Sequence, residues 1–495
     1  MGGGLRTVSY LCYIALAALL FPCAGAATFQ VSSNLQAAID AASPGDVLQV
    51  GPGAYDKIEI TKSLSLIGNG ATITAGDRDA CVRVLANGVN ISGFLVRNGF
   101  YGISLENVTK CAITDNTVIR CTQPGIMLKF SDNNVVERNN ASFNGLGGEG
   151  WYGIYLTNSN HNLIVDNAAI GNGAYGINLF PSCNNNTIKG NVLEKNMYGL
   201  YMFRDCTNNL IESNTMAINT NSGVDMRFDC HDNIIVNNIV TNNAVAGITL
   251  MEGSIKNAIK GNVISNNSRY GIQIQSRSDG NTVVGNNISN SQTGIFLDSS
   301  GNLLYGNRLA DNVIQADDRG RNTWNAAYPT GGNMWSDYLG QDKMTGPGQD
   351  APGIDHIGDE PYKINDHSAD RYPLMGNQVQ PIKIIEKRVD PISATVGNNI
   401  AVKVKLKSKY DLGSVVVHAM SPKGVAPGGY VSMALSGDVY TGTLATALMD
   451  PGKYNLELSV GDARGNELKE SLGEIEIIPR GAGTFSPSSS NGGKS

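Results

Sequence analysis

The chain has 495 residues, a net charge of −6 at neutral pH and 16 % charged residues, with 59 glycines and 17 prolines. This composition excludes a collagen repeat and a proline-rich disordered chain. The acidic balance argues against nucleic acid as a partner, because binding to a phosphate backbone requires clustered lysine and arginine.

Residues 1–26 have the pattern of a secretory signal peptide. Arg6 precedes an apolar run from Tyr10 to Phe21, and Ala24-Gly25-Ala26 is a small-residue cleavage site. The run is too short to span a bilayer, and no later stretch is long and apolar enough for a transmembrane anchor. We therefore expect an exported protein that is secreted, periplasmic or at the cell surface. A lipoprotein cysteine at Cys23 is the alternative interpretation.

Internal repetition dominates the region from Tyr101 to Gly320, where asparagine is also concentrated. A glycine followed by an aliphatic residue recurs every 23 or 24 residues, apart from one interval of 28. An asparagine marker runs in step and absorbs the same insertion, which is the glycine-rich stretch Gly145–Gly150. The glycines are Gly102, Gly125, Gly153, Gly176, Gly199, Gly223, Gly247, Gly271 and Gly294, and the asparagines are Asn116, Asn139, Asn167, Asn191, Asn214, Asn238, Asn262, Asn286 and Asn307.

Each repeat contains short runs of alternating apolar and polar residues, bounded by asparagine, glycine or serine. Such alternation predicts strands, and a repeat of three short strands without a helix predicts a parallel β-helix that rises about 4.8 Å per turn. We expect an all-β fold with about 11 or 12 turns of three strands each. The asparagines should lie at the bends, where they tolerate left-handed dihedrals, and should stack in hydrogen-bonded ladders.

The pattern resembles the right-handed parallel β-helix proteins, and more closely the NosD-like family, over residues 31–376. The opening LQAAIDAASPGDVLQVGPGAYDKIEI (35–60) is similar to the family's capping helix and first turn. The segment 324–375, with WNAAYPTGGNMWSDYLG and GIDHIGDEPYKI, is similar to its closing segment. The resemblance implies a β-helix over 27–320 and a cap over 321–377. The functions it implies are diverse, because this superfamily includes hydrolases, lyases, binding proteins and copper-site maturation factors.

After the β-helix the composition changes, and asparagine becomes scarce while lysine and glutamate rise. Seven alternating strand segments between residues 378 and 480 predict an immunoglobulin-like or fibronectin-like β-sandwich without a core disulfide. Such modules present or dock other domains, so another surface protein is a candidate partner. Residues 481–495 are rich in glycine and serine, and we expect this tail to be disordered.

Outward positions of successive turns should align, at the second and fourth residues after each repeat glycine. Aromatic side chains there lie beside arginines and carboxylates, a combination that suits sugar rings and their hydroxyl or uronate groups. Trp151 and Tyr152, with the loop Gly145–Gly150, could form a wall beside this face. An ordinary solvated face with ion pairs between turns is the alternative. The candidate binding residues are Tyr155, Phe180, Tyr201, Phe203, Arg204, Asp205, Asp225, Arg227 and Glu252.

Catalysis would require paired carboxylates, and Asp225, Asp229 and Glu252 are the candidates for acid and base. Arg227 could stabilise negative charge in a lyase reaction. Motifs familiar from β-helix enzymes are missing, since the sequence has neither Gly-His-Gly nor Arg-Ile-Lys nor the Asp-Pro-His run of mannuronan epimerases.

Two groups of residues could hold a metal. Cys183, Cys206 and Cys230 occupy one register position in three successive turns, where they could fill a small-residue ladder, form one disulfide, or offer soft ligands to copper with His231 and Met226 nearby. Asp residues in the closing segment could bind Ca²⁺, although they lack the alternating spacing of a tight calcium loop. These are Asp342, Asp350, Asp355 and Asp359.

The sequence favours an exported, non-catalytic extracellular or cell-surface protein that binds or organises a polysaccharide or glycoconjugate. The alternative is a carbohydrate-active enzyme, either a polysaccharide lyase or a glycoside hydrolase. Copper-site maturation or copper binding in the NosD manner is favoured least.

Overall fold

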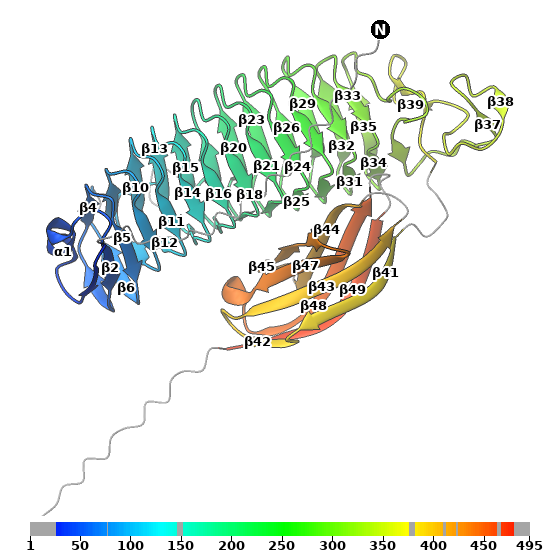
Figure 1. Ribbon diagram of the computed structural model, residues 1–495. Helices are drawn as coiled ribbons and strands as arrows, with labels where there is room; N and C mark the ends of the chain where they lie inside the picture. The colour runs from blue at the N-terminus through cyan, green and yellow to red at the C-terminus, as the bar shows by residue number, and fades with distance from the viewer. Residues whose placement is uncertain are drawn as a thin grey trace, which may run out of the picture.

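The computed structural model describes residues 26–479 except 77, 146–151, 376–381, 409–411, 422–423 and 463–466. The expected tail, nearly all of the expected signal peptide, Trp151 and most of the loop Gly145–Gly150 therefore lie outside the described residues. Figure 1 shows a long solenoid of stacked turns with a smaller β domain beside its C-terminal half. Within the described residues, no helix is long and apolar enough to cross a membrane.

The solenoid is built from three parallel faces, named sheets A, B and C here. Sheet A has thirteen strands, which corresponds to about thirteen turns. The sequence predicted about 11 or 12 turns, because the turns before Gly102 lack the repeat markers. Its strands are β1 (Thr28–Val31), β2 (Val47–Val50), β5 (Ser65–Gly68), β8 (Asn90–Ser92), β11 (Ala112–Thr114), β14 (Val135–Glu137), β16 (Leu163–Val165), β18 (Thr187–Lys189), β21 (Leu210–Glu212), β24 (Ile234–Val236), β27 (Ala258–Lys260), β30 (Thr282–Val284) and β33 (Leu303–Tyr305).

Sheet B is divided into a four-stranded and a seven-stranded part, which isolated parallel bridges connect. Its strands are β3 (Gly53–Tyr55), β6 (Ala71–Thr74), β9 (Leu95–Arg97) and β12 (Thr117–Ile119), then β19 (Val192–Glu194), β22 (Thr215–Ala217), β25 (Ile239–Thr241), β28 (Val263–Ser265), β31 (Asn287–Ser289), β34 (Arg308–Ala310) and β36 (Met334–Trp335).

Sheet C has twelve strands, and several of them are the longest of the solenoid. They are β4 (Ile58–Ile60), β7 (Val82–Val84), β10 (Ile103–Glu106), β13 (Ile126–Lys129), β15 (Tyr152–Thr157), β17 (Tyr175–Leu179), β20 (Tyr198–Phe203), β23 (Ser222–Arg227), β26 (Ala246–Leu250), β29 (Tyr270–Gln275), β32 (Thr293–Asp298) and β35 (Ile314–Asp318). The expected parallel β-helix is thus confirmed.

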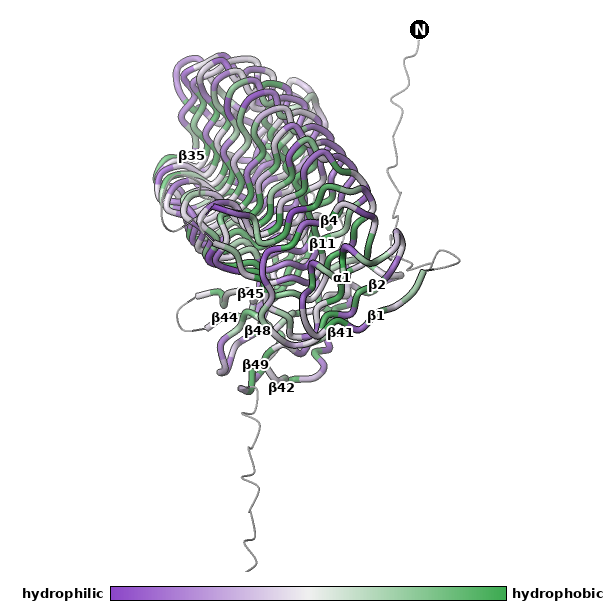
Figure 2. The backbone as a smooth tube through the Cα atoms, turned by 90° about the vertical axis from the view of Figure 1, so that its left-hand side faces the viewer, coloured by the Kyte–Doolittle hydropathy of each residue, from purple (hydrophilic) through white to green (hydrophobic). Residues whose placement is uncertain are grey.

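Alternate residues of each strand point into a continuous apolar core. In one turn, Ile177, Leu179, Ile188 and Leu193 are fully buried. Figure 2 shows the resulting rows of apolar residues, which run along the stacked turns and alternate with polar rows. This alternation is what the period-2 pattern of the sequence predicts.

Buried asparagines stack along the solenoid axis at the corners. The side chain of Asn214 is typical: its Oδ1 accepts from the backbone N–H of Asn191 at 2.9 Å, and its Nδ2 donates to Ile188 O at 2.8 Å and to Asn238 Oδ1 at 3.0 Å. The expected ladder is thus present. Two further ladders, at the other corners, contain Asn134, Asn162, Asn186, Asn209, Asn233, Asn257, Asn281, Asn302 and Asn322, and Asn144, Asn172, Asn196, Asn219, Asn243 and Asn267.

The expected reason for these asparagines is partly wrong. Left-handed dihedrals belong to the residue before the ladder asparagine, for example Asp115 with φ of 56° and Gly190 with φ of 67°. The repeat glycines are required for a steric reason, because the backbone of the next turn lies too close for a side chain. A Cβ on Gly199 would lie 2.6 Å from the carbonyl oxygen of Gly223, so this corner admits only glycine without a shift of the backbone.

Both ends of the solenoid are covered. At the N-terminal end, α1 (Leu35–Ala41) buries Leu35 and Ile39 against the first turns. At the other end, the buried Trp324 donates its indole N–H to Asp318 at 2.7 Å. The closing segment also contains the short hairpins β37 (Met344–Thr345) with β38 (Ala351–Pro352), and β39 (Tyr362–Lys363) with β40 (Ala369–Asp370).

The C-terminal domain has two mainly antiparallel sheets around a shared apolar core, which is consistent with the expected sandwich. One sheet contains β41 (Ile382–Asp390), β43 (Asn399–Ser408), β46 (Ala434–Ser436) and β47 (Val439–Ala445), and the other contains β42 (Ser393–Thr395), β44 (Leu412–Ser421), β45 (Gly424–Ser432), β48 (Gly452–Asp462) and β49 (Glu467–Ile478), with the 3₁₀ turn η1 (Thr446–Leu448).

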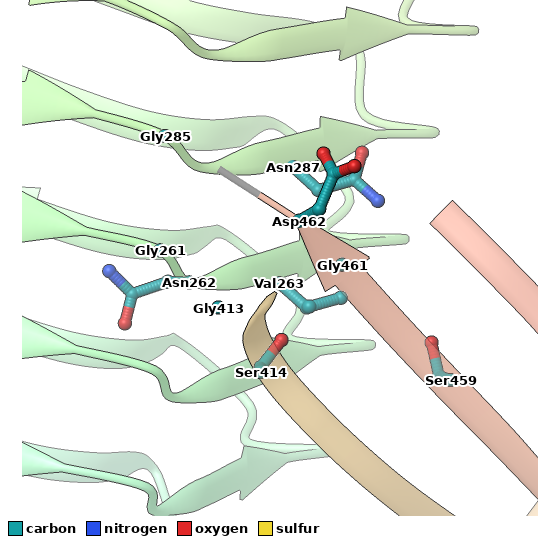
Figure 3. Close-up of a pocket in the computed structure, with 10 residues that line it drawn as sticks. All are labelled: Gly261, Asn262, Val263, Gly285, Asn287, Gly413, Ser414, Ser459, Gly461 and Asp462. Atoms are coloured by element: carbon teal, nitrogen blue, oxygen red, sulfur yellow. The ribbon is translucent and has the colours of Figure 1, made fainter. Parts of the chain in front are cut away.

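The C-terminal domain lies against sheet B of the solenoid. A gap of about 30 Å³ between them is lined by Val263 and Asn287 of the solenoid and by Ser414 and Asp462 of the C-terminal domain, as Figure 3 shows. A gap of this size holds no more than about one water molecule. The contact is therefore a packing interface and not a ligand site.

The asparagine ladders should carry much of the stability. Asn214→Ala leaves the N–H of Asn191 and the carbonyl of Ile188 without their partners, so we expect the free energy of unfolding to fall by about 3 kcal/mol. Denaturant unfolding measures this change. The matched control is Asn69→Ala, at an exposed position after β5, which should change stability by less than about 0.5 kcal/mol. Equal losses in the two variants would contradict the assigned role.

Candidate functional site

Sheet C presents most of the sequence-predicted binding residues on its outer side. Neighbouring strands pair in register, so that Tyr155, Asn178, Tyr201 and Asp225 form one row along the solenoid. Successive members are about 4.8 Å apart. The predicted alignment of outward residues is therefore present in the structure.

A second row consists of the tyrosines that precede the repeat glycines, of which the sequence analysis named only Tyr152, as a wall beside the face. Tyr152, Tyr175 and Tyr198 pair in register, and their rings stack at 5.3 and 5.5 Å between centroids, with interplanar angles of 12° and 15°. Tyr201 packs against Tyr198 at 5.2 Å. Burial raises the pKa of Tyr175 to about 12, so this phenol stays protonated at neutral pH. The recurrence of Tyr-Gly in the sequence was the available signal.

The rows of tyrosines continue into a cluster of phenylalanines. The ring of Phe203 lies 5.8 Å from Tyr201, 5.2 Å from Phe180 and 4.6 Å from Phe228. The guanidinium of Arg204 lies 5.4 Å from the Phe203 centroid, in reach of a cation–π contact. We call the eight aromatic residues the aromatic face: Tyr152, Tyr155, Tyr175, Phe180, Tyr198, Tyr201, Phe203 and Phe228.

Asp225 and Arg227 form a closed ion pair at the C-terminal end of the aromatic face. Arg227 Nε donates to Asp225 Oδ1 at 2.7 Å, and Nη2 donates to Oδ2 at 3.0 Å. The Asp225 side chain is 1 % exposed, whereas that of Arg227 is 28 % exposed. Burial raises the pKa of Asp225 although Arg227 opposes this, and the Asp225 charge raises the pKa of Arg227. Asp225 thus holds Arg227 in position, and only Arg227 meets solvent.

The other predicted polar residues lie in the turns after the strands. Asp205 and Asp229 are exposed, and Glu252 is half-buried. The backbone N–H of Asp229 donates to Glu252 O at 3.1 Å, so these two residues occupy adjacent turns. The Glu252 charge also contributes to the raised pKa of Asp225. The structure therefore brings Asp225, Arg227, Asp229 and Glu252 to one end of the aromatic face.

The three aligned cysteines lie inside the solenoid core. Cys183, Cys206 and Cys230 are fully buried free thiols, and burial raises the pKa of Cys183 and Cys230. His231 faces the outside instead, because its imidazole is 42 % exposed and contacts Asp232 at 2.7 Å. The described residues contain no group of three or more His, Cys, Asp or Glu side chains that could hold a metal ion. His231 and the three thiols therefore do not share one metal site.

The aspartates of the closing segment bind backbone amides. Asp342 accepts from the N–H of His356 at 2.9 Å, and Asp359 accepts from the N–H of Met344 at 2.9 Å. Asp355 accepts from the backbone N–H of Ile357 at 3.0 Å and from the side chain of Gln349 at 3.0 Å. These contacts fold the loop onto itself. The predicted fourth member, Asp350, is not part of them in the contacts described.

Comparisons with known proteins identify a family and one curated relative. The model of the family described as periplasmic copper-binding protein (NosD) matches residues 58–225 and 203–340. A cell surface glycoprotein of Methanothermus fervidus is 38 % identical over 96 residues, which cover 18 % of this chain and 16 % of that protein. The chain thus aligns with only a small part of this relative.

Two solved structures illustrate the similarity in three dimensions. The A-module of the mannuronan C-5 epimerase AlgE6 from Azotobacter vinelandii is 19 % identical, with 62 % of this chain and 95 % of that chain covered and a TM-score of 0.46. The catalytic domain of a GH87 alpha-1,3-glucanase in complex with nigerose is 15 % identical, with 62 % and 67 % covered and a TM-score of 0.49. Similarity at this level gives no indication of this chain's activity.

The ion pair yields a pH-dependent prediction. Arg227→Met leaves the buried Asp225 carboxylate without its partner, which should lower the free energy of unfolding by about 3 kcal/mol at pH 7. Losing the arginine raises the pKa of Asp225 further, so the carboxyl is neutral at low pH and the loss should shrink toward pH 4.

Denaturant unfolding at both pH values measures this dependence. The control is Asp225→Asn with Arg227→Met, which removes both charges and should recover most of the stability at pH 7. A loss that is independent of pH, or no recovery in the double variant, would contradict the assigned pairing.

Proposed function

The chain belongs to the periplasmic copper-binding protein (NosD) family, and on this premise we propose that it is an exported protein that binds a polysaccharide along the aromatic face without cleaving it. The observation that carries the proposal is the aromatic face itself, eight rings in contact along one side of the solenoid. Rings with an apolar body and polar hydroxyl tips suit sugars, which also combine apolar faces with hydroxyl groups.

The regular repeat of the solenoid favours a polymer over a single sugar as the ligand. Similar side chains return about every 4.8 Å along the axis, so an extended chain would meet the same kinds of group at successive turns. Tyr155, Tyr201 and Phe203 are each half-buried, which leaves part of every ring open to a ligand while neighbouring rings hold it in place. Arg227 would add hydrogen bonds to hydroxyl groups at one end.

The geometry supports binding over catalysis. A glycosidase needs one carboxyl group as acid and a second one as base or nucleophile, both in reach of the sugar. Asp225 is 1 % exposed and bonded through both oxygens to Arg227, which leaves it poorly placed for either role. Asp229 and Glu252 remain as the pair that an enzyme of this fold would use.

Copper binding has less support from the residues present. The family description names copper, yet the three core thiols are sealed from solvent and His231 points away from them. The described residues also offer no other group of three suitable ligands.

The proposed place of action is outside the cytoplasm, at the cell surface or in the periplasm. The signal-like residues 1–26, the periplasmic family and the cell surface relative agree in this respect. The C-terminal domain would then be a spacer or a contact for another surface protein, since it packs on sheet B, whereas most of the aromatic face belongs to strands of sheet C.

The test is binding to a glycan array. Tyr201→Ala with Phe203→Ala removes the centre of the aromatic face and should weaken binding by roughly tenfold or more. The matched control is Phe29→Ala with Tyr305→Ala, which removes two accessible rings of sheet A and should leave binding unchanged.

Analysis of the glycan after binding distinguishes binding from catalysis. The bound glycan should be recovered intact, and Asp229→Asn should bind as the parent does. If the protein releases unsaturated or new reducing-end products, and Asp229→Asn or Glu252→Gln abolishes this release, the binding proposal is wrong and the protein is a carbohydrate-active enzyme. Equal losses in both double aromatic variants would contradict the aromatic face as the binding site.

A further inference from the structure

We infer that the aromatic face selects an uncharged polysaccharide of neutral hexose or pentose units and discriminates against uronate polymers. This inference rests on the proposed function and adds the chemical class of the glycan. Three features of the described residues carry it: an arginine that is already neutralised, an excess of carboxylates, and buried acceptors without donors.

The arginine best placed to bind a uronate is already occupied. A carboxylate is recognised most strongly by two parallel N–H groups of a guanidinium. Arg227 uses Nε and Nη2 for Asp225, at 2.7 and 3.0 Å. Because Asp225 is buried, its charge is shielded little by water and stays paired with Arg227. The remaining N–H groups of Arg227 can still donate to a ligand, but Asp225 already neutralises the guanidinium charge, so the net attraction of the pair for a second carboxylate is weak.

The surrounding turns carry more negative than positive charge. The turns directly after β20, β23 and β26 contain two cations, Arg204 and Lys256. They also contain four carboxylates: Asp205, Asp229, Asp232 and Glu252. The guanidinium of Arg204 also lies over the ring of Phe203. With the Asp225–Arg227 pair neutral as a unit, the excess is two negative charges. A polymer with a carboxylate on every sugar would meet repulsion along this end of the face.

Two of the buried oxygen atoms that lack a hydrogen-bond partner among the described residues belong to this region of sheet C. These are Oδ1 of Asn178, whose residue is 3 % exposed, and Oε2 of Glu252. Asn178 lies in register between Tyr155 and Tyr201, in the middle of the aromatic face. Neighbouring side chains cover both atoms, so a ligand reaches them only when a side chain moves, and as acceptors they are then matched by groups that donate. Sugar hydroxyls donate and accept, whereas an ionised uronate carboxylate only accepts.

The experiment compares oligosaccharides that differ only at C6, which carries a carboxylate in one member of each pair and a primary alcohol in the other. Oligomers of galacturonan, mannuronan and glucuronan are each prepared as the native uronate and with every carboxyl reduced to a primary alcohol. Titration calorimetry at low and high NaCl gives the affinity of the full chain for each member of a pair. For at least one pair, we expect the reduced oligomer to bind about tenfold more tightly at low salt, with an affinity that salt leaves unchanged.

A single substitution tests the origin of the preference. Glu252→Gln removes one negative charge and one acceptor at nearly constant shape, so the preference for the reduced oligomer should narrow about threefold. The matched control is Glu212→Gln on sheet A, which should leave the preference unchanged. Thermal unfolding of both variants establishes that they are folded.

The outcomes separate this inference from the proposed function. A uronate that binds more tightly than its reduced partner, with an affinity that falls with salt, would overturn the inference and leave polysaccharide binding intact. An unchanged preference in Glu252→Gln would also contradict the charge argument. Failure of all six oligomers to bind would overturn the proposed function and the inference together.

Discussion

The solenoid depends on the hydrogen bonding of amide side chains that its corners bury. Each turn bends at the corners between short strands, and every bend removes backbone N–H and C=O groups from water. A buried asparagine at the corner supplies both a donor and an acceptor. Asn214 shows the arrangement: it accepts from the backbone of one turn and donates to the side chain of the next. An unfilled position would leave polar groups unpaired in the core, so all turns must keep one register.

Strict register on the inside has a consequence on the outside. When every corner aligns, outward residues of successive turns also align, and a side-chain type that recurs in the sequence becomes a continuous row. The stacked Tyr152, Tyr175 and Tyr198 arise in this way, directly before the glycines that the close approach of turns requires. The aromatic face on the outside and the asparagine ladders on the inside thus result from the same sequence repeat. Its end is set where serine and Asp225 replace tyrosine in β23.

The markers of the repeat made the fold predictable from the sequence. The burial and the ion pairing of individual site residues could not be predicted in the same way. The glycine and asparagine spacing and the alternation within each repeat led to the parallel β-helix, and the outward position of Tyr201 followed from it. Tyr175 was not predicted, because it precedes the repeat glycine and the outward positions were assigned only after that glycine. Asp225 was predicted as an exposed acid, yet its neighbours in adjacent turns bury it. Such burial depends on side chains some 24 residues away in sequence, which local patterns do not encode.

The most direct test of the account is hydroxyl-radical footprinting of the protein with and without the neutral oligosaccharide that binds most tightly. A ligand on the aromatic face should protect Tyr201, Phe203 and Phe228 from oxidation and leave Phe29 and Tyr305 on sheet A unchanged. Protection that falls instead on sheet A, on the closing segment or on the C-terminal domain, with Tyr201 and Phe203 oxidised as in the free protein, would contradict it.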